Sequence, residues 1–277
     1  MKCLTLNTHS WMEEQPLEKL EIIAQFILRH DFDWVALQEV NQSITSEALL
    51  PDDYFCQTKA ETIGIKTDNF ALNLVERLQE LGLDYYWSWT CSHIGYDRYE
   101  EGVALLSKTP FIADSLLVSP MDDMTDYHTR RQLMSISTTD TGVTYRVMSN
   151  HYSWWSENAS EGFQYEWQQL QLVLSKQKMP TILMGDFNAP SHIQGESFTA
   201  MTGDFSDTFL CSKEVSGEAT VVGVIDGWHD RDTLPEMRLD YILVPAESVV
   251  SEHMVVFDGK NSPIVSDHFG VMAEIKF

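Results

Sequence analysis

The feature that most constrains the fold of this chain is a series of short apolar runs, each of strand length and most followed by polar residues. Such runs predict buried strands. We predict strands at residues 2–6, 34–38, 85–90, 103–107, 111–118, 132–138, 144–150, 181–184, 239–244, 249–257 and 270–276. Apolar residues at helical spacing predict helices at 16–29, 69–81 and 163–175. The chain is therefore expected to combine strands and helices.

No repeat and no Pro/Gly/Ser-rich linker divides the 277 residues, so we expect residues 1–277 to form one domain. Hydrophobic residues make up 43% of the chain, which is enough to bury a sizeable core. Four long segments, 52–68, 92–101, 119–130 and 215–238, are predicted as loops. Loops of this length in a compact domain are often functional.

The charge balance bears on the choice of partner. Lys and Arg number 18 against 42 Asp and Glu, a net charge of −24. Nucleic-acid-binding proteins usually carry a basic stripe, so a nucleic acid partner is disfavoured. It is not excluded, because a bound cation can reverse the sign of an acidic cleft. Nothing in the sequence indicates an obligate protein partner.

The cysteines and the hydropathy pattern indicate the cellular compartment. The four cysteines lack the CxxC spacing of a zinc site. No apolar run approaches the ~20 residues needed to span a membrane. Residues 1–7 turn polar too soon for a signal peptide. We therefore expect a cytoplasmic protein with reduced thiols and no membrane association.

Polar motifs at the ends of the apolar runs carry the candidate chemistry. They contain Asn7, Glu39, His151, Asp186 with Asn188, Asp240, and Asp267 with His268. Side chains just past strand ends can meet at one edge of a sheet. Carboxylate and amide oxygens select Mg²⁺ or Mn²⁺ over zinc, and histidines can stabilise a phosphoryl oxyanion. Each residue alone has an ordinary explanation as a cap, turn or surface acid; Gly185-Asp186-Phe187-Asn188 is the strongest single motif.

The order of these motifs along the chain resembles that of the endonuclease/exonuclease/phosphatase superfamily, the relatives of DNase I. The resemblance covers essentially the whole chain and is most specific at Asp186 with Asn188 and at Ser266-Asp267-His268. It implies an α+β fold, a four-layer α/β/β/α sandwich with two central mixed β-sheets. It also implies a metal-dependent phosphoric ester hydrolase in which activated water attacks phosphorus in line.

The resemblance further implies a role for each residue. Glu39 would bind the metal, with Asn7 beside it. Asp186 would orient or deprotonate the attacking water, and Asn188 would bind the phosphate or a metal. Asp240 would support the metal, while Asp267, close to both metal and histidine, would support the histidine. His151 and His268 would contact the scissile phosphate, and Glu101 would be the carboxylate that pairs with His151.

The loops bear on the substrate. The segments 6–11, 92–97 and 100–104, with Trp154-Trp155, are similar to those of bacterial sugar-phosphate phosphatases that act on maltose 6'-phosphate. This similarity implies a small phosphorylated sugar, and a disaccharide phosphate in particular. In the abasic-site DNA-repair branch of the superfamily, an aspartate stands where this chain has His9. This difference weakens the interpretation of the chain as a DNA-repair endonuclease. A nuclease acting on DNA or RNA remains the alternative.

Aromatic and basic residues near these loops are the candidate substrate contacts. Indole faces suit a sugar ring, but they also stack on nucleobases or simply pack in a core. Arginine matches phosphate oxygens bidentately, although a surface ion pair is the ordinary alternative. The predicted substrate-binding residues are His9, Trp11, Arg130, Arg131, Trp154, Trp155 and Trp228.

Overall fold

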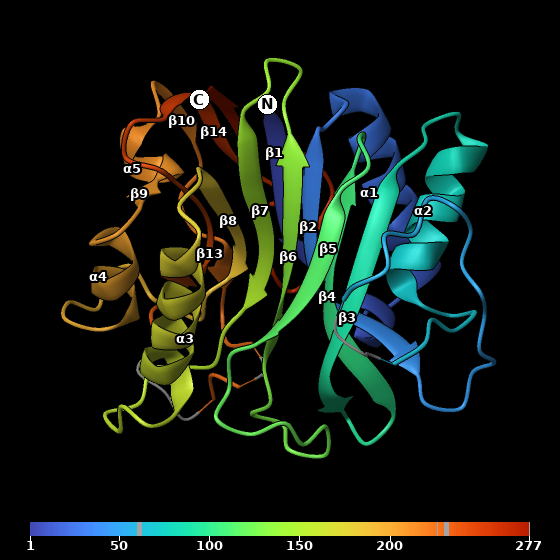
Figure 1. Cartoon of the computed structure of the whole chain (residues 1–277), viewed down its shortest axis with the longest axis horizontal. Helices are drawn as coiled ribbons and strands as arrows, with labels where there is room; N and C mark the ends of the chain where they lie inside the picture. Colours follow the sequence, from blue (N-terminus) through green and yellow to red (C-terminus); the bar gives the residue numbers. More distant parts are fainter. Residues whose placement is uncertain (60–62, 226, 230–232, 277) are drawn as a thin grey trace.

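The computed structural model describes residues 1–59, 63–225, 227–229 and 233–276 (Figure 1). Two mixed sheets form its centre. In spatial order, the first contains β10 (Glu214–Ser216), β14 (Val249–Val256), β15 (Gly270–Lys276), β1 (Lys2–Asn7), β2 (Trp34–Ser43), β4 (Tyr99–Ser107) and β3 (Tyr86–Gly95). The second contains β5 (Ile112–Leu117), β6 (Arg131–Thr138), β7 (Thr144–His151), β8 (Thr181–Asp186), β13 (Asp240–Val244) and β9 (Ser206–Asp207). A short ribbon pairs β11 (Val221–Val222) with β12 (Glu236–Met237).

Helices cover the two outer faces (Figure 1). The helices α1 (Pro16–His30) and α2 (Phe70–Glu80) pack on the first sheet, and α3 (Gly162–Lys176) and α4 (Ser197–Thr202) pack on the second. Two shorter helices are α5 (Thr208–Cys211) and the 3-10 turn η1 (Ser10–Met12). The predicted four-layer sandwich is confirmed.

Alternation along the strands explains why two sheets stack. In β2, Trp34 and Ala36 point into a core shared by both sheets, whereas Val35 and Leu37 point into the core beneath α1 and α2. Successive side chains of a strand face opposite sides. A continuous apolar run therefore has both faces buried, as the middle layers of a sandwich require.

One predicted loop is wrong. Residues 92–101 are not a loop but the ends of β3 and β4, which form a long hairpin closed by a turn in which Tyr96 and Asp97 have positive φ. The error has a physical reason: the hairpin buries polar side chains, among them Ser92, His93 and Glu101, so no apolar pattern marks it. The predicted loop 119–130 is confirmed. The segment 215–238 contains the end of β10 together with β11 and β12. Its residues 226 and 230–232, and residues 60–62 of the predicted loop 52–68, lie outside the described residues.

His253, on β14, gives the fold a predicted acid sensitivity. It is 2% exposed, its Nδ1 lies 2.9 Å from Thr208 Oγ1, and its Nε2 is buried without a hydrogen bond. Burial, reinforced by Arg238, lowers its pKa from 6.5 to about 3. The unfolded chain therefore takes up a proton first, and stability falls as the pH drops from 6.5 toward 3, by up to about 1.4 kcal/mol per pH unit.

We expect His253→Asn to flatten this dependence, since the amide can keep the Thr208 contact without titrating. Thermal melts of both proteins between pH 7 and pH 4 check it. Parallel curves of Tm against pH for the two proteins would show that another group sets the acid sensitivity.

Candidate active site

Polar residues at the ends of four strands, and one within a fifth, meet at one edge of the sandwich. Asn7 ends β1, His151 ends β7 and Asp186 ends β8. Asp240 begins β13, and because β13 runs antiparallel to β8 it pairs directly with Asp186. Glu39 lies in β2 at a positive φ of 51°, where the ladder to β4 is interrupted. This irregularity turns one carboxylate out of the strand alternation and toward the others.

Asn7 links the two sheets through its side-chain amide. Its Nδ2 donates to Glu39 Oε1 at 2.8 Å and to Asp186 Oδ2 at 3.1 Å. Burial raises the pKa of Asp186 to about 7, an effect that His268 opposes and Asp240 reinforces. Burial likewise raises the pKa of Glu39 to about 8, with Glu101 and Asp267 adding to the effect. The site thus concentrates more negative charge than its own cations offset.

Two histidines flank Asp186. His268 Nε2 lies 3.8 Å and His151 Nε2 3.6 Å from Asp186 Oδ2. Burial alone would lower the pKa of His268, but Asp240 and Asp186 raise it well above its ordinary value. The pKa of His151 is lowered well below its ordinary value by burial, and further by Arg130. One charged and one neutral imidazole therefore face the same carboxylate.

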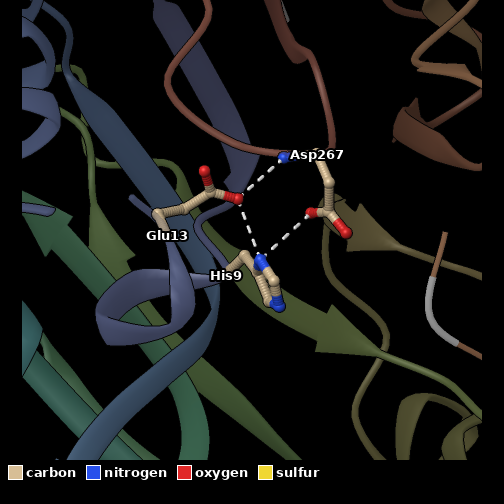
Figure 2. A group of neighbouring side chains, drawn as sticks. All are labelled: His9, Glu13 and Asp267. Atoms are coloured by element: carbon tan, nitrogen blue, oxygen red, sulfur yellow. Dashed lines mark hydrogen bonds and ion pairs between the residues drawn. The ribbon is translucent and has the colours of Figure 1, made fainter. Parts of the chain in front are cut away.

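The partner of His268 corrects the sequence analysis. His268 Nδ1 lies 2.9 Å from Asp240 Oδ2, so the hydrogen-bond partner of this histidine is Asp240, and Asp267 acts on it only through its charge. Asp267 instead faces His9, whose Nδ1 lies 3.8 Å from Asp267 Oδ1 and 2.8 Å from Glu13 Oε1 (Figure 2). Burial opposes the charge on His9, but the Glu13 hydrogen bond, Glu39 and Asp267 raise its pKa to about 9.

Glu101 is also placed differently from the prediction. It lines the site, but its ion-pair partner is His93, with Nε2 to Oε1 at 3.3 Å, and no pairing with His151 is found among the described residues. Arg130 Nη1 donates to His93 Nδ1 at 3.1 Å. His93 therefore connects Arg130 to Glu101. His93 was not among the predicted site residues, because its segment was expected to be a loop.

The two predicted arginines have protein partners. Arg130 is 1% exposed and also donates to the Thr129 carbonyl at 3.2 Å. Arg131 pairs with Asp122 at 2.6 Å. Burial opposes the lowering of the Glu101 pKa, which is due first to His93 and then to Arg130; the pKa of His151 is lowered first by burial and then by Arg130. Arg130 therefore acts on the site through its charge.

The tryptophans divide into different roles. Trp154 lines the site cavity, which has a volume of about 20 Å³ and is also lined by Tyr96, Tyr127 and Ile225, none of them predicted. Trp228 Nε1 donates to Asn188 Oδ1 at 3.0 Å.

Trp11 is held away from the cavity: its Nε1 donates to the carbonyls of Asn41 and Asp68, and its ring packs edge-on against Phe70. Trp155 lines a neighbouring cavity.

Asn188 is fixed on every side. It has a positive φ of 46°, its N–H donates to Asp186 Oδ1 at 2.8 Å, and its Nδ2 donates to the Tyr152 carbonyl at 2.9 Å. With Trp228 on Oδ1 and Tyr152 on Nδ2, two contacts set the orientation of the side-chain amide. The predicted pairing of Asp186 and Asn188 in one site is thus present in the structure.

The residues present fit a hard divalent cation. Carboxylate oxygens cluster with few cations, and Asp240 Oδ1 is buried without a hydrogen bond. Three groups of ligand-type atoms lie within 4.8 Å of one another: Glu39, His151 and Asp186; Asp186, Asp240 and His268; and the group in Figure 2, His9, Glu13 and Asp267. Oxygen-rich sites of this kind suit Mg²⁺ or Mn²⁺.

The two stacked sheets, with carboxylates and two histidines at their shared edge, define a DNase I-like fold of the phosphoester-hydrolase class. The family model described as the endonuclease/exonuclease/phosphatase family matches residues 12–268, and the chain belongs to this family. Members of the superfamily are hydrolases that act on phosphoesters.

Similar solved structures support the fold. An endonuclease/exonuclease/phosphatase family protein from Leptotrichia buccalis is 31% identical over 100% of both chains, with a TM-score of 0.84. A mannosyl-6-phosphatase from Bacteroides thetaiotaomicron is 17% identical over 100% of both chains, with a TM-score of 0.66. D. rerio TDP2, complexed with a single-strand DNA product, is 16% identical over 100% of this chain and 99% of the other, with a TM-score of 0.60. No curated protein matches the chain.

Proposed function

We propose that this protein is a divalent-metal-dependent phosphomonoesterase that hydrolyses a small phosphorylated sugar, such as a disaccharide phosphate, in the cytoplasm as a single domain. The observation that carries the proposal is the position of Asp186 between two histidines and beside the Asn7–Glu39 pair. A carboxylate in this position can orient a water molecule toward phosphorus and accept its proton.

The neighbouring side chains supply the remaining chemistry. His268, kept charged by Asp240, offsets negative charge that develops on the phosphoryl oxygens. Asn188, fixed by Trp228 and Tyr152, offers a preorganised amide. Glu39, Asn7, Asp240 and Asp267 are the residues that would hold Mg²⁺ or Mn²⁺, which when bound polarises a phosphate oxygen and stabilises the leaving alkoxide.

Charge favours a small substrate over nucleic acid. The chain carries a net charge of −24, and Arg130 and Arg131 are engaged by His93 and Asp122. Neither arginine is therefore free to track a polyphosphate backbone. The mannosyl-6-phosphatase among the structural relatives is consistent with a sugar phosphate, whereas TDP2 supports the alternative of a nuclease. None of the described helices is long and apolar enough to cross a membrane.

A substrate panel tests the proposal. The protein is incubated in Mg²⁺ with hexose 6-phosphates, maltose 6'-phosphate, nucleotides, oligonucleotides and plasmid DNA, and phosphate release and strand cleavage are followed. We expect phosphate release from one or more sugar phosphates and none of comparable efficiency from the nucleic acids. Cleavage of DNA or RNA without release from any sugar phosphate would replace the proposal by the nuclease alternative.

Metal binding has its own predicted signature. Adding Mg²⁺ or Mn²⁺ to the metal-free protein is expected to raise Tm, because a ligand at 100 times its Kd stabilises the folded state by about 2.7 kcal/mol. Glu39→Gln should remove most of this shift. Glu21→Gln, on an exposed carboxylate paired with Arg77, is the control and should retain it. Equal shifts in all three proteins would place the metal elsewhere.

A further inference from the structure

A second cavity lies beside the site cavity. Its volume is about 310 Å³, and it lies between the 119–130 segment and the start of α3. Trp154 lines both cavities. His151, at the site, is only two residues from Ser153, which lines the second cavity. A molecule whose phosphate lay at Asp186 would therefore extend naturally into this space.

The walls of the second cavity are held in place by the start of α3. Phe163 N–H donates to the Trp154 carbonyl at 3.0 Å. Gly162 has a positive φ of 61°, and a Cβ there would lie 2.7 Å from the same carbonyl oxygen. Only glycine permits this close approach at this φ. The cavity is thus a fixed feature of the fold and does not depend on the rotamer of one exposed side chain.

The lining combines flat aromatic faces with buried acceptors. Trp154 and Trp155 supply the aromatic faces. Glu166 is 1% exposed, and the one backbone N–H it accepts, from Ser153 at 2.8 Å, uses a fraction of the acceptor sites of a carboxylate. Ser153 Oγ is buried next to it without a hydrogen bond of ordinary geometry. Buried polar groups of this kind call for a partner that supplies hydroxyl groups.

The charge of the cavity limits what can enter. Of the described residues that line it, two are glutamates and none is a lysine or an arginine. A second phosphate, as in a nucleic acid strand, would face the Glu166 and Glu161 carboxylates with no lysine or arginine in the lining to bind it. A neutral polyhydroxylated ring meets acceptors at its hydroxyls and indole at its faces. The volume lies at the small end of ligand pockets, about 300–1,000 Å³, and suits one ring.

We propose that this cavity is the subsite for the leaving group and that it binds one sugar ring through Glu166, Ser153 and the indoles of Trp154 and Trp155. The proposal rests on the phosphomonoesterase function proposed above and extends it. It makes Glu166 and Ser153 specificity residues: they select the alcohol released and take no part in the attack on phosphorus.

The test compares two substrates that differ only in the leaving group. The values of kcat/KM are measured for a sugar phosphate found active in the panel, with maltose 6'-phosphate and glucose 6-phosphate tried first, and for p-nitrophenyl phosphate, whose leaving group has no sugar hydroxyls. Glu166→Gln and Ser153→Ala are each expected to lower the ratio of sugar to aryl kcat/KM at least about tenfold, mainly through KM. Glu157→Gln, on the same segment but exposed and outside the cavity, should leave the ratio at the wild-type value.

A second readout does not depend on sugar phosphate turnover. The unphosphorylated sugars maltose and glucose are expected to inhibit p-nitrophenyl phosphate hydrolysis by the wild-type protein, and Ser153→Ala should weaken that inhibition. Because it compares the wild type with Ser153→Ala, this measurement tests the sugar subsite even if Glu166→Gln does not fold.

The results distinguish failure of the sugar subsite from failure of the phosphomonoesterase function. If sugar phosphates are hydrolysed but the ratio is the same in wild type and both subsite variants, the phosphomonoesterase function stands and the subsite is wrong. If no sugar phosphate is hydrolysed and no sugar inhibits, both are wrong. Binding of a nucleobase instead, seen as inhibition by free nucleosides alone, also overturns the sugar subsite.

Discussion

Replacing Asp186 by asparagine is expected to lower kcat by about 10³-fold, because the amide cannot accept a proton from the attacking water. The stability of the metal-free protein, in contrast, should not fall. Burial raises the pKa of Asp186 to about 7, so at pH 8 the folded, metal-free protein carries a buried charge that the unfolded chain exposes to water. Removing it cancels that cost. The Tm of Asp186→Asn in metal-free buffer at pH 8 should equal or exceed that of the wild type.

Asp207→Asn is the matched control for this pair of effects. Asp207 is also a buried aspartate, but it caps α5 and pairs with Arg238 outside the site. Breaking a buried pair leaves an uncompensated charge and is strongly destabilising. We expect this variant to lose Tm and to keep most of its kcat. Steady-state kinetics and thermal melts on both variants decide the matter; an Asp186→Asn protein with wild-type kcat would remove Asp186 from the mechanism.

Gly185→Ala is expected to prevent normal folding. Gly185 has φ +149° and pairs with Asn150 of the parallel strand β7. A Cβ at Gly185 would lie 1.9 Å from the Asn150 carbonyl oxygen, which is backbone and cannot rotate away. The two site-forming strands would have to separate. We expect a loss of several kcal/mol in the free energy of unfolding, seen as a large fall in Tm or as insoluble protein.

Gly142→Ala separates steric overlap from backbone strain. Gly142 also has a positive φ, +84°, but nothing lies within 4 Å of a Cβ built there. The expected cost is about 1 kcal/mol, the ordinary cost of alanine at such a φ. Chemical denaturation of both variants gives the comparison. Similar losses at the two positions would mean that the close approach of β7 and β8 is not what requires glycine before Asp186.

Much of the fold could be predicted from the sequence because its information is local. Continuous apolar runs such as those in β2 and β8 indicate strands that are buried on both faces, which is what a four-layer sandwich needs. The part of the β3–β4 hairpin at residues 92–101 could not be found in this way. Its buried side chains include His93 and Glu101, which form an ion pair across the hairpin, and a polar pair of this kind leaves no apolar pattern in the sequence.

The sequence by itself determined the strand-end residues of the site. Asn7, His151 and Asp186 each follow a strand-forming run, and strand ends collect at one edge of a sheet. Only the tertiary structure decided which side chains contact one another. Asp240 reaches His268 because antiparallel β13 starts opposite the end of β8, while the adjacent Asp267 faces His9. Pairing of this kind depends on strand register and on the direction of each side chain, over separations in the sequence at which no local pattern carries information.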